Sequence, residues 1–233
     1  MTADPRLIVP LDLPTVDEAR DMVERLGDSV SFYKIGLELL ASDGMALARD
    51  LKREGRSVFL DWKLHDIGAT VERSARVLAG AGCDLLTVHA EPQVMRAAVL
   101  ARGDSDLKIL AVTVLTSLTD ADLAEMGYAF GARDLVERRI RQAIDCGVDG
   151  IVSSPHEASL AREIAHGAAR PDFLVVTPGV RPAWSEKNDQ ARAATPEAAL
   201  RAGASHLVCG RPITAAADPR EAALKVIAEM AGV

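Results

Sequence analysis

The stretch Ser57-Val58-Phe59-Leu60-Asp61-Trp62-Lys63-Leu64-His65-Asp66 sets how the rest of this chain is interpreted. Its first four residues are largely apolar, as in a buried strand, and charged residues follow at once. Because the side chains of a strand alternate between its two faces, we expect Asp61 and Lys63 on one face, with Asp66 just beyond on the following turn. Two acids and one ammonium group would then share one small volume.

Charged residues also end two earlier apolar runs. Lys34 follows Val30-Ser31-Phe32-Tyr33, and Asp12 follows the run at 7–11. Each one alone is most simply a solvated strand end. Lysine is depleted in strands, however, and here opposite charges stand at the same ends of three successive strand-like runs. The pattern therefore predicts one shared charged site.

Strand-like runs alternate with amphipathic helical stretches along the whole chain. Besides the stretch quoted above, the runs predict strands at 7–11, 30–35, 85–88, 109–115, 150–152, 173–177 and 206–209. Helical periodicity or helix-start signals predict helices at about 16–26, 38–54, 67–81, 92–99, 135–144, 156–165 and 218–230, and a helix that opens at 195–197. A short piece at about 121–126 precedes the helix at 135–144. Eight strands, each followed by a helix, predict a single-domain α/β fold, a closed (β/α)8 TIM barrel that spans 1–233.

An open, doubly wound parallel sheet is the competing fold. Two features favour the barrel. No Gly-x-Gly-x-x-Gly follows the first strand, and the polar residues gather after many strands rather than at one crevice. In a barrel these strand ends form a single ring.

Composition limits the classes of function. The chain has 233 residues and a formal net charge of -7, which argues against a general nucleic-acid binder but leaves room for a local phosphate pocket. The start lacks a signal-peptide pattern and no apolar run is long enough to span a bilayer, so we expect a cytoplasmic protein without membrane contact. Cys83, Cys146 and Cys209 are widely spaced and predict buried, reduced thiols rather than a metal site.

Two motifs late in the chain predict a phosphate site. Pro178-Gly179-Val180-Arg181 follows the seventh strand and Gly210-Arg211-Pro212 follows the eighth. Barrels commonly bind phosphate there, with backbone N–H groups, a helix N-terminus and a guanidinium. The polar loop at about 178–194 lacks periodicity, and its length favours a functional lid that grips the phosphate.

Together these motifs resemble the orotidine 5'-phosphate decarboxylase family. The resemblance covers nearly the whole chain and rests on Asp61-x-Lys63-x-His65-Asp66-Ile67 with Thr70-Val71, Thr177-Pro178-Gly179-Val180-Arg181, Asp189-Gln190 and Gly210-Arg211-Pro212. It implies decarboxylation of orotidine 5'-phosphate to UMP in de novo pyrimidine biosynthesis, without cofactor or metal, in a homodimer with shared active sites. The family more often has Pro-Asn where this chain has Gly68-Ala69, a change that leaves the charged residues intact.

The resemblance also implies a role for individual residues. The charged catalytic network would be Lys34, Asp61, Lys63 and Asp66, with Lys63 as the proton donor. Asp12 and Lys34 would bind the ribose, and Thr116 and Ser117 would lie at the pyrimidine. The phosphate end would be bound by Pro178, Arg181, Gln190, Gly210 and Arg211. Ile67 and Thr70 would also contribute to substrate binding. Of these residues, Asp66, Ile67 and Thr70 would reach the active site of the partner subunit.

The chemistry of such a reaction demands charge rather than a cofactor. Loss of CO2 from C6 leaves a carbanion in the plane of the ring, with no electron sink in conjugation. An ammonium fixed beside C6 stabilises that developing charge and can then deliver the proton. Flanking acids would keep Lys63 charged in a closed site, where burial alone favours the neutral amine.

Three alternatives remain open at this point. A Mg2+-dependent sugar-phosphate decarboxylase or aldolase of the same barrel type would need an acidic metal ligand at the end of the second strand, where Lys34 stands. A non-catalytic nucleotide-phosphate-binding barrel would have no need of Lys63 between two acids. An isomerase would use a glutamate or histidine base, for which His65 and His89 are candidates. We expect instead that His65 is a hydrogen-bonding residue of the turn and that His89 is an inward-facing residue at the barrel rim.

Overall fold

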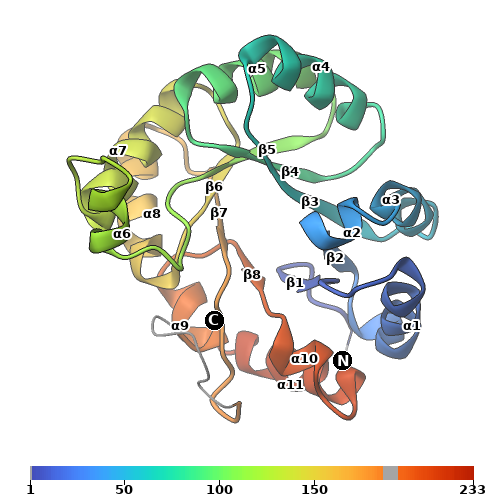
Figure 1. The fold of residues 1–233 in the computed structure, drawn as a ribbon. Coiled ribbons are helices and arrows are strands. Elements are labelled where there is room, and N and C mark those ends of the chain that lie inside the picture. The colour runs from blue at the N-terminus through green and yellow to red at the C-terminus, as the bar shows by residue number, and fades with distance from the viewer. Residues whose placement is uncertain (1, 186–193) are drawn as a thin grey trace.

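Eight parallel strands close into one barrel in the computed structural model, which describes residues 2–185 and 194–233 (Figure 1). The strands are β1 Leu7–Pro10, β2 Phe32–Ile35, β3 Ser57–Leu64, β4 Leu85–His89, β5 Lys108–Val112, β6 Gly150–Val152, β7 Leu174–Thr177 and β8 His206–Val208. Each pairs with its neighbours in the chain, and β1 pairs with β8 to close the ring. The predicted (β/α)8 barrel is confirmed, and the open doubly wound sheet is excluded.

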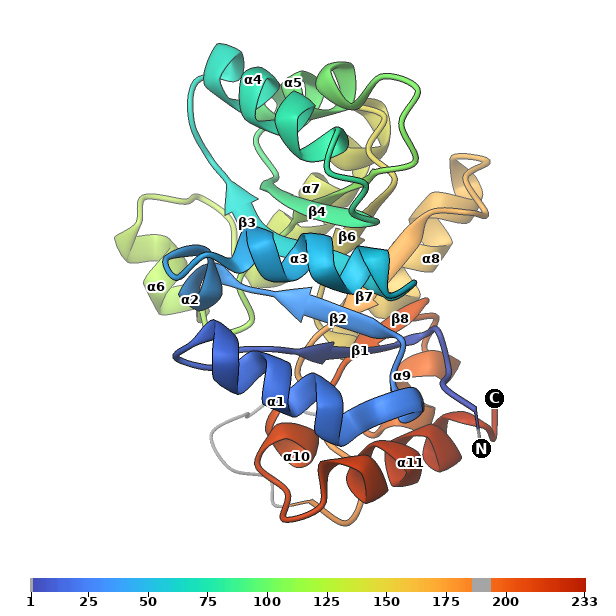
Figure 2. The ribbon, with the colours of Figure 1, turned by 90° about the vertical axis from the view of Figure 1, so that its right-hand side faces the viewer.

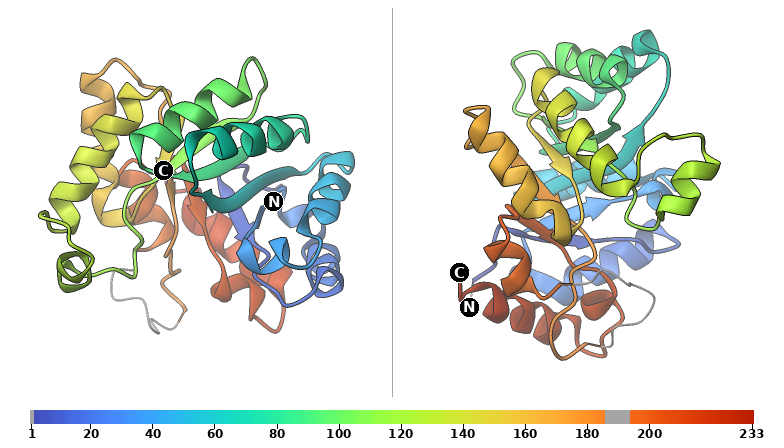
Figure 3. Two further views of the ribbon diagram at one scale, coloured as in Figure 1. Left: turned by 45° about the horizontal axis from the view of Figure 1, so that its top comes forward. Right: turned by 90° about the vertical axis from the view of Figure 1, so that its left-hand side faces the viewer.

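The helices surround the strands (Figure 2). They are α1 Val16–Leu26, α2 Leu37–Leu40, α3 Gly44–Arg53, α4 Gly68–Ala79, α5 Pro92–Arg102, α6 Asp120–Glu125, α7 Ala132–Asp145, α8 Ala158–Gly167, α9 Pro196–Arg201, α10 Arg211–Thr214 and α11 Pro219–Met230, with 3-10 turns η1 Gly27–Ser29 and η2 Pro155–Glu157. Helices α7 and α8 pack together on the flank opposite α1 and α3 (Figures 1 and 3). Within 2–185 and 194–233, no helix is long and apolar enough to cross a membrane.

The interior of the barrel is filled by one apolar cluster. Its buried members come from seven strands and are Ile8, Phe32, Phe59, Leu85, Leu110, Val176 and Val208. A larger cluster fills the space between strands and helices and includes the three cysteines, which are free and buried as predicted. Because inward positions recur every second residue, the next inward layer toward the carboxyl ends of β2, β3 and β4 is polar: Lys34, Asp61 and Thr87.

The helix predicted at 38–54 is instead two helices, α2 and α3. Asp43 lies between them with φ 64°, a left-handed conformation that aspartate tolerates better than most residues. At Gly44 an added Cβ would lie 2.6 Å from the carbonyl oxygen of Leu39, so the turn is too tight for a side chain there. The apolar periodicity runs on through this turn, which is why the sequence pattern did not separate the two helices.

Strand β3 is longer than expected and irregular near its end. It pairs regularly with β4 as far as Leu60, which lies opposite Leu86, and the next pair is Leu64 with Val88. Three residues of β3, Asp61 to Lys63, therefore face a single residue of β4, which is Thr87. Lys63 has φ 48°, so this bulge redirects the chain at the lysine itself.

Candidate active site

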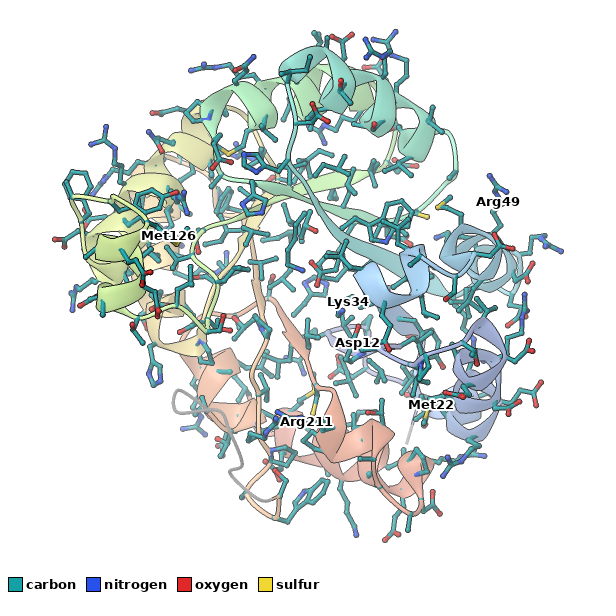
Figure 4. The ribbon with its side chains drawn as sticks, viewed as in Figure 1. Asp12, Met22, Lys34, Arg49, Met126 and Arg211 are labelled. Carbon is teal, nitrogen blue, oxygen red and sulfur yellow. The ribbon has the colours of Figure 1, made fainter. Side chains whose placement is uncertain are left out.

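A row of alternating charges crosses the carboxyl ends of β1, β2 and β3. Lys34 Nζ lies 2.9 Å from Asp12 Oδ1 and 3.4 Å from Asp61 Oδ2. Lys63 Nζ lies 2.9 Å from Asp61 Oδ1. We call Asp12, Lys34, Asp61 and Lys63 the charged row; Asp12 and Lys34 are labelled at the barrel mouth in Figure 4. The predicted gathering of charges from three successive strand ends is therefore present.

Gly36, just after β2, makes room for the outer part of the charged row. A Cβ at this position would lie 2.6 Å from Asp12 Oδ1 and 3.0 Å from Lys34 Nζ. Both distances are shorter than ordinary van der Waals contact. A side chain at this position would therefore displace the Asp12–Lys34 ion pair, and glycine leaves it in place.

Thr87 supports the inner part of the charged row from β4, and the sequence analysis did not identify it. The backbone N–H of Lys63 donates to Thr87 Oγ1 at 2.9 Å, and the Thr87 hydroxyl lies 3.0 Å from Asp61 Oδ1. Thr87 is fully buried. The available signal was a single hydroxyl residue inside the apolar run at 85–88, at an inward-facing position.

Asp61 is ionised although most of its side chain is buried. Burial has the largest single effect and raises the pKa of the Asp61 carboxyl, whereas the ammonium groups of Lys34 and Lys63 lower it. Hydrogen bonds from Lys63 and Thr87 lower the pKa further, so that it lies below its usual value. One buried carboxylate thus holds two ammonium groups in fixed positions.

Two connected cavities open above the charged row. One, of about 400 Å³, is lined by the charged row together with Pro178, Gly179, Arg181, Gly210 and Arg211, and we call it the polar cavity after these charged side chains. The other, of about 190 Å³, is largely apolar and is lined by Lys34, Asp61, Lys63, Phe59, Val112, Val114, Leu115, Thr116, Val152, Ser153, Pro178 and Val208. The three inner charged residues line both cavities, so they lie where an anionic half and a flat, apolar half of one ligand would meet.

The predicted phosphate motifs both reach the polar cavity. Arg181 is buried, and its backbone N–H donates to the carbonyl of Ala194 at 2.9 Å. Gly210 precedes α10, and Arg211 is the first residue of that helix. Of the predicted lid at 178–194, only its two ends are described, and Gln190 lies outside the described residues.

The segment after β3 lies outside both cavities of its own chain. Asp66 is exposed, and its Oδ1 accepts a hydrogen bond from the backbone N–H of Ile67 at 2.6 Å. Ile67 is 67% exposed, and the hydroxyl of Thr70 accepts a hydrogen bond from Arg73. The expectation that Asp66 shares one small volume with Asp61 and Lys63 is wrong for a single chain, because the bulge and the turn carry it outward.

Other predicted residues at the rim are placed as follows. Thr116 lines the apolar cavity, whereas Ser117 is exposed and is not among its lining residues. Among residues 2–185 and 194–233, the His65 ring has no hydrogen bond within its turn; it packs on the His89 ring with centroids 4.7 Å apart, and its Nε2 lies 3.7 Å from Glu91 Oε2. Burial lowers the pKa of His89, which ends β4 at the rim. In the described part of the chain, no three His, Cys, Asp or Glu side chains group closely enough to hold a metal ion.

Comparison with known proteins gives consistent matches over the full length. The family model for the orotidine 5'-phosphate decarboxylase / HUMPS family matches residues 5–226. An orotidine 5'-phosphate decarboxylase of Caulobacter vibrioides (strain NA1000 / CB15N) is 85% identical over 233 residues, which cover 100% of each chain. One from Rhodopseudomonas palustris (strain BisB5) is 58% identical, with 98% of this chain and 97% of the relative covered. The crystal structure of orotidine 5'-phosphate decarboxylase from Lactobacillus acidophilus matches with a TM-score of 0.84 at 36% identity, over 97% of this chain and 99% of that one.

Proposed function

Because the chain belongs to the orotidine 5'-phosphate decarboxylase family, we propose that its charged row carries out the reaction of that family, with Lys63 as the proton donor. The enzyme is a carboxy-lyase of pyrimidine biosynthesis that converts orotidine 5'-phosphate to UMP and CO2. One observation carries the assignment of Lys63. Its ammonium is fixed 2.9 Å from a buried carboxylate and lines both cavities at their junction.

The two cavities fit the two ends of the substrate. The phosphate belongs in the polar cavity, where Arg181 and Arg211 supply guanidinium groups and Gly210 a backbone N–H. The pyrimidine belongs in the apolar cavity beside Thr116. The ribose then spans the junction, with its hydroxyls toward the Asp12–Lys34 ion pair. This placement puts C6 of the ring near Lys63.

The reaction needs a fixed positive charge at C6 and a proton. When the bond between C6 and the carboxylate breaks, its electron pair stays on C6 and CO2 leaves. The Lys63 ammonium stabilises this carbanion more than it stabilises the starting carboxylate, and then transfers its proton to C6. The Asp61 carboxylate holds the Lys63 ammonium in place. The resulting amine regains a proton from solvent after UMP leaves.

We propose that the enzyme works as a homodimer with shared active sites. The segment with Asp66, Ile67 and Thr70 lies outside the cavities of its own chain and presents Ile67 largely exposed. A second copy placed against this segment would add an acid and an apolar side chain to the neighbouring site. A cytoplasmic location stays a prediction from the sequence.

The metal-dependent alternative conflicts with the position of Lys34. Its ammonium lies between the carboxylates of Asp12 and Asp61, at 2.9 and 3.4 Å, and so occupies the place that a divalent cation would take between them. We therefore propose that no metal takes part in the reaction. A cation at Lys34 would repel Mg2+, whereas it suits the anionic substrate.

Loss of orotidylate absorbance after EDTA treatment tests this proposal. The wild-type enzyme should turn over without added metal, and Lys63→Ala should lose ~10⁴-fold or more in kcat, because it removes both the proton donor and the fixed charge. Lys108→Ala is the matched control, since Lys108 begins β5 at the opposite end of the barrel. Turnover that requires Mg2+, or a Lys63→Ala enzyme of normal rate, would overturn the proposal.

A further inference from the structure

Thr87 touches the charged row at two points, on two different groups. Its Oγ1 accepts a hydrogen bond from the backbone N–H of Lys63 at 2.9 Å and lies 3.0 Å from Asp61 Oδ1. The carbonyl oxygen of Leu60 is farther away, at 3.4 Å. The side chain is fully buried and lines neither cavity, so substrate does not reach it.

The direction of these bonds follows from the atoms involved. The backbone N–H of Lys63 is only a donor, so Thr87 Oγ1 must accept there, and the hydroxyl has one proton left to give. The ionised carboxylate of Asp61 is only an acceptor and is nearer than the Leu60 carbonyl. The hydroxyl proton therefore points to Asp61.

These bonds close a ring around the proposed proton donor. The Lys63 N–H binds Thr87, Thr87 binds the Asp61 carboxylate, and that carboxylate binds the Lys63 ammonium at 2.9 Å. The ring ties the backbone of Lys63 to the head of the same side chain. A shift of the backbone would consequently move the ammonium, the carboxylate, or both.

The backbone of Lys63 needs such a tie because the sheet does not provide one. The ladder between β3 and β4 is interrupted between Leu60 and Leu64, and Lys63 has φ 48°. A left-handed lysine costs free energy and persists only where its surroundings hold it. The Thr87 hydroxyl takes the N–H that a regular ladder would have paired with a carbonyl.

We propose that Thr87 is a positioning residue for the decarboxylation. Its hydroxyl holds Lys63 and Asp61 in the correct positions relative to the reacting carbon. It gives no proton to the substrate and acts only through these two residues. The inference rests on the proposed role of Lys63. It adds a function for a strand residue outside the D-x-K-x-H-D motif.

Thr87→Val and Thr87→Ser separate the hydroxyl from the shape of the side chain. Valine keeps the volume but leaves the Lys63 N–H without its acceptor and removes one bond from Asp61, so kcat should fall by ~10- to 100-fold through misplacement of the ammonium. KM for orotidine 5'-phosphate should stay within ~3-fold, since Thr87 does not contact the substrate. Serine keeps the hydroxyl and should restore kcat to within ~3-fold of wild type.

Thr113→Val is the matched control for loss of a buried hydroxyl. Thr113 follows β5 at the same end of the barrel, is fully buried, and its hydroxyl donates to the carbonyl of Val152 at 3.1 Å. It has no contact with the charged row among the described hydrogen bonds. Thr113→Val should lower thermal stability without the fall in kcat, which separates a local role of Thr87 from a general loss of packing.

The pH dependence of kcat gives a second readout. Burial raises the pKa of Asp61, and its ammonium and hydroxyl neighbours lower it, so loss of the Thr87 hydroxyl should raise this pKa. Because the enzyme needs Asp61 ionised, the fall of kcat on acidification should begin at a higher pH in Thr87→Val. Thr113→Val should keep the wild-type profile. The groups that face Asp61 from β2 and β3, Lys34 and Lys63, are unchanged in both variants.

The outcomes distinguish this inference from the proposed function. A lower kcat with nearly unchanged KM, rescue by serine and a shifted acid limb support the positioning role. A Thr87→Val enzyme with wild-type kcat and pH profile overturns it, while inactive Lys63→Ala would leave the proposed function standing. If Thr87→Val does not fold, Thr87→Cys, which has a similar size and a weaker donor, provides the same comparison.

Discussion

Asp61 and Asp66 belong to one short motif, yet the structure treats them in opposite ways. The Asp61 side chain is 15% exposed and is held by two ammonium groups and the Thr87 hydroxyl. Asp66 is exposed, and the partner described for its carboxylate is the N–H of the next residue. Ion pairs and a hydrogen bond hold the first acid at the bulge of β3, whereas the second stands on a turn that leads into α4.

This difference shows which part of the site one chain builds by itself. The charged row needs only the ends of β1 to β4 and the bulge in β3, so it is complete within a single barrel. The segment Asp66 to Thr70 contributes nothing to the cavities of its own chain. A single motif can therefore serve two sites, one in its own subunit and, as we propose, one in the partner subunit.

After Lys63→Ala, Asp61→Asn should give the largest effect on the part that the chain builds alone. The substitution leaves two ammonium groups beside a neutral amide, and removal of one partner from a buried ion pair costs roughly 3–5 kcal/mol. We expect kcat/KM to fall by ~10²- to 10⁴-fold, measured by loss of orotidylate absorbance. Asp172→Asn, in an exposed position before β7, should leave the rate unchanged.

A near-normal rate in Asp61→Asn would also decide a secondary hypothesis. The Asp61 carboxylate near the substrate carboxylate is expected to destabilise the bound ground state by like-charge repulsion. If the neutral amide supports the same kcat, that repulsion makes no contribution. The difference in burial and ion pairing between Asp61 and Asp66 would then matter only for the stability of the fold.

Mixed dimers test whether Asp66 acts across the interface. Lys63→Ala and Asp66→Ala enzymes should each be nearly inactive. In a hybrid of the two, one site receives both substitutions and the other receives neither, so random mixing should restore about a quarter of wild-type activity. Recovery is measured after the two inactive proteins are unfolded together and refolded.

The absence of any recovery would place Asp66 in the site of its own chain. In that case each hybrid site would retain one substitution, and activity would stay at the level of the two parents. Wild-type subunits carried through the same unfolding and refolding control for losses during the procedure. The comparison of the two acids depends on this result more than on any single substitution.

The sequence predicted the charged row because parallel strand ends converge. Alternation along a strand and charges at the ends of three apolar runs were sufficient to predict that the four residues of the charged row lie together. The closed barrel likewise followed from the alternation of strands and helices. Each of these signals is local, and the topology of the barrel supplies the rest.

The features that the sequence did not reveal depend on pairing between distant segments. The bulge at Lys63 exists only in relation to the register of β4, and Thr87 gains its contacts through that bulge. The break between α2 and α3 depends on a left-handed Asp43, which no periodicity records. Asp66 was expected beside Lys63 because alternation was continued past the point where the strand ends.

Arg211→Ala tests the phosphate end of the polar cavity, which is built within one chain and lies away from the reacting carbon. Loss of the guanidinium from the polar cavity should lower kcat/KM by ~2–4 kcal/mol equivalents, the scale of a broken charge pair with the phosphate. If binding at the phosphate orders the proposed lid and the charged row, kcat should fall together with affinity. Steady-state kinetics separate the two. A change in KM alone at unchanged kcat would contradict that coupling.

Gly36→Ala should have a smaller effect, confined to the outer end of the charged row. The new Cβ would lie 2.6 Å from Asp12 Oδ1 and would displace that carboxylate from Lys34. Because Asp12 is proposed to bind the ribose rather than to act at C6, we expect KM to rise ~10-fold with a smaller change in kcat. Gly167→Ala, at the end of α8, controls for backbone effects, since nothing lies within 4 Å of its added Cβ and its φ is not positive. A fall in kcat as large as that of Asp61→Asn would show that the row acts as one unit.

Ile67→Gln should give the smallest effect on the chain and a selective one on assembly. Ile67 is 67% exposed, so the free energy of unfolding at a protein concentration below the dimer range should change by less than ~0.5 kcal/mol. If a second subunit covers this side chain, loss of its apolar contact should raise the dimer dissociation constant by ~10-fold, measured by sedimentation equilibrium. Met126→Gln is the matched control, because Met126 is 59% exposed and lies at the end of α6, well away from α4 (Figures 1 and 4). Equal dissociation constants for both variants would mean that the partner subunit does not cover Ile67. The exposure of the segment from Asp66 to Thr70 would then need another explanation.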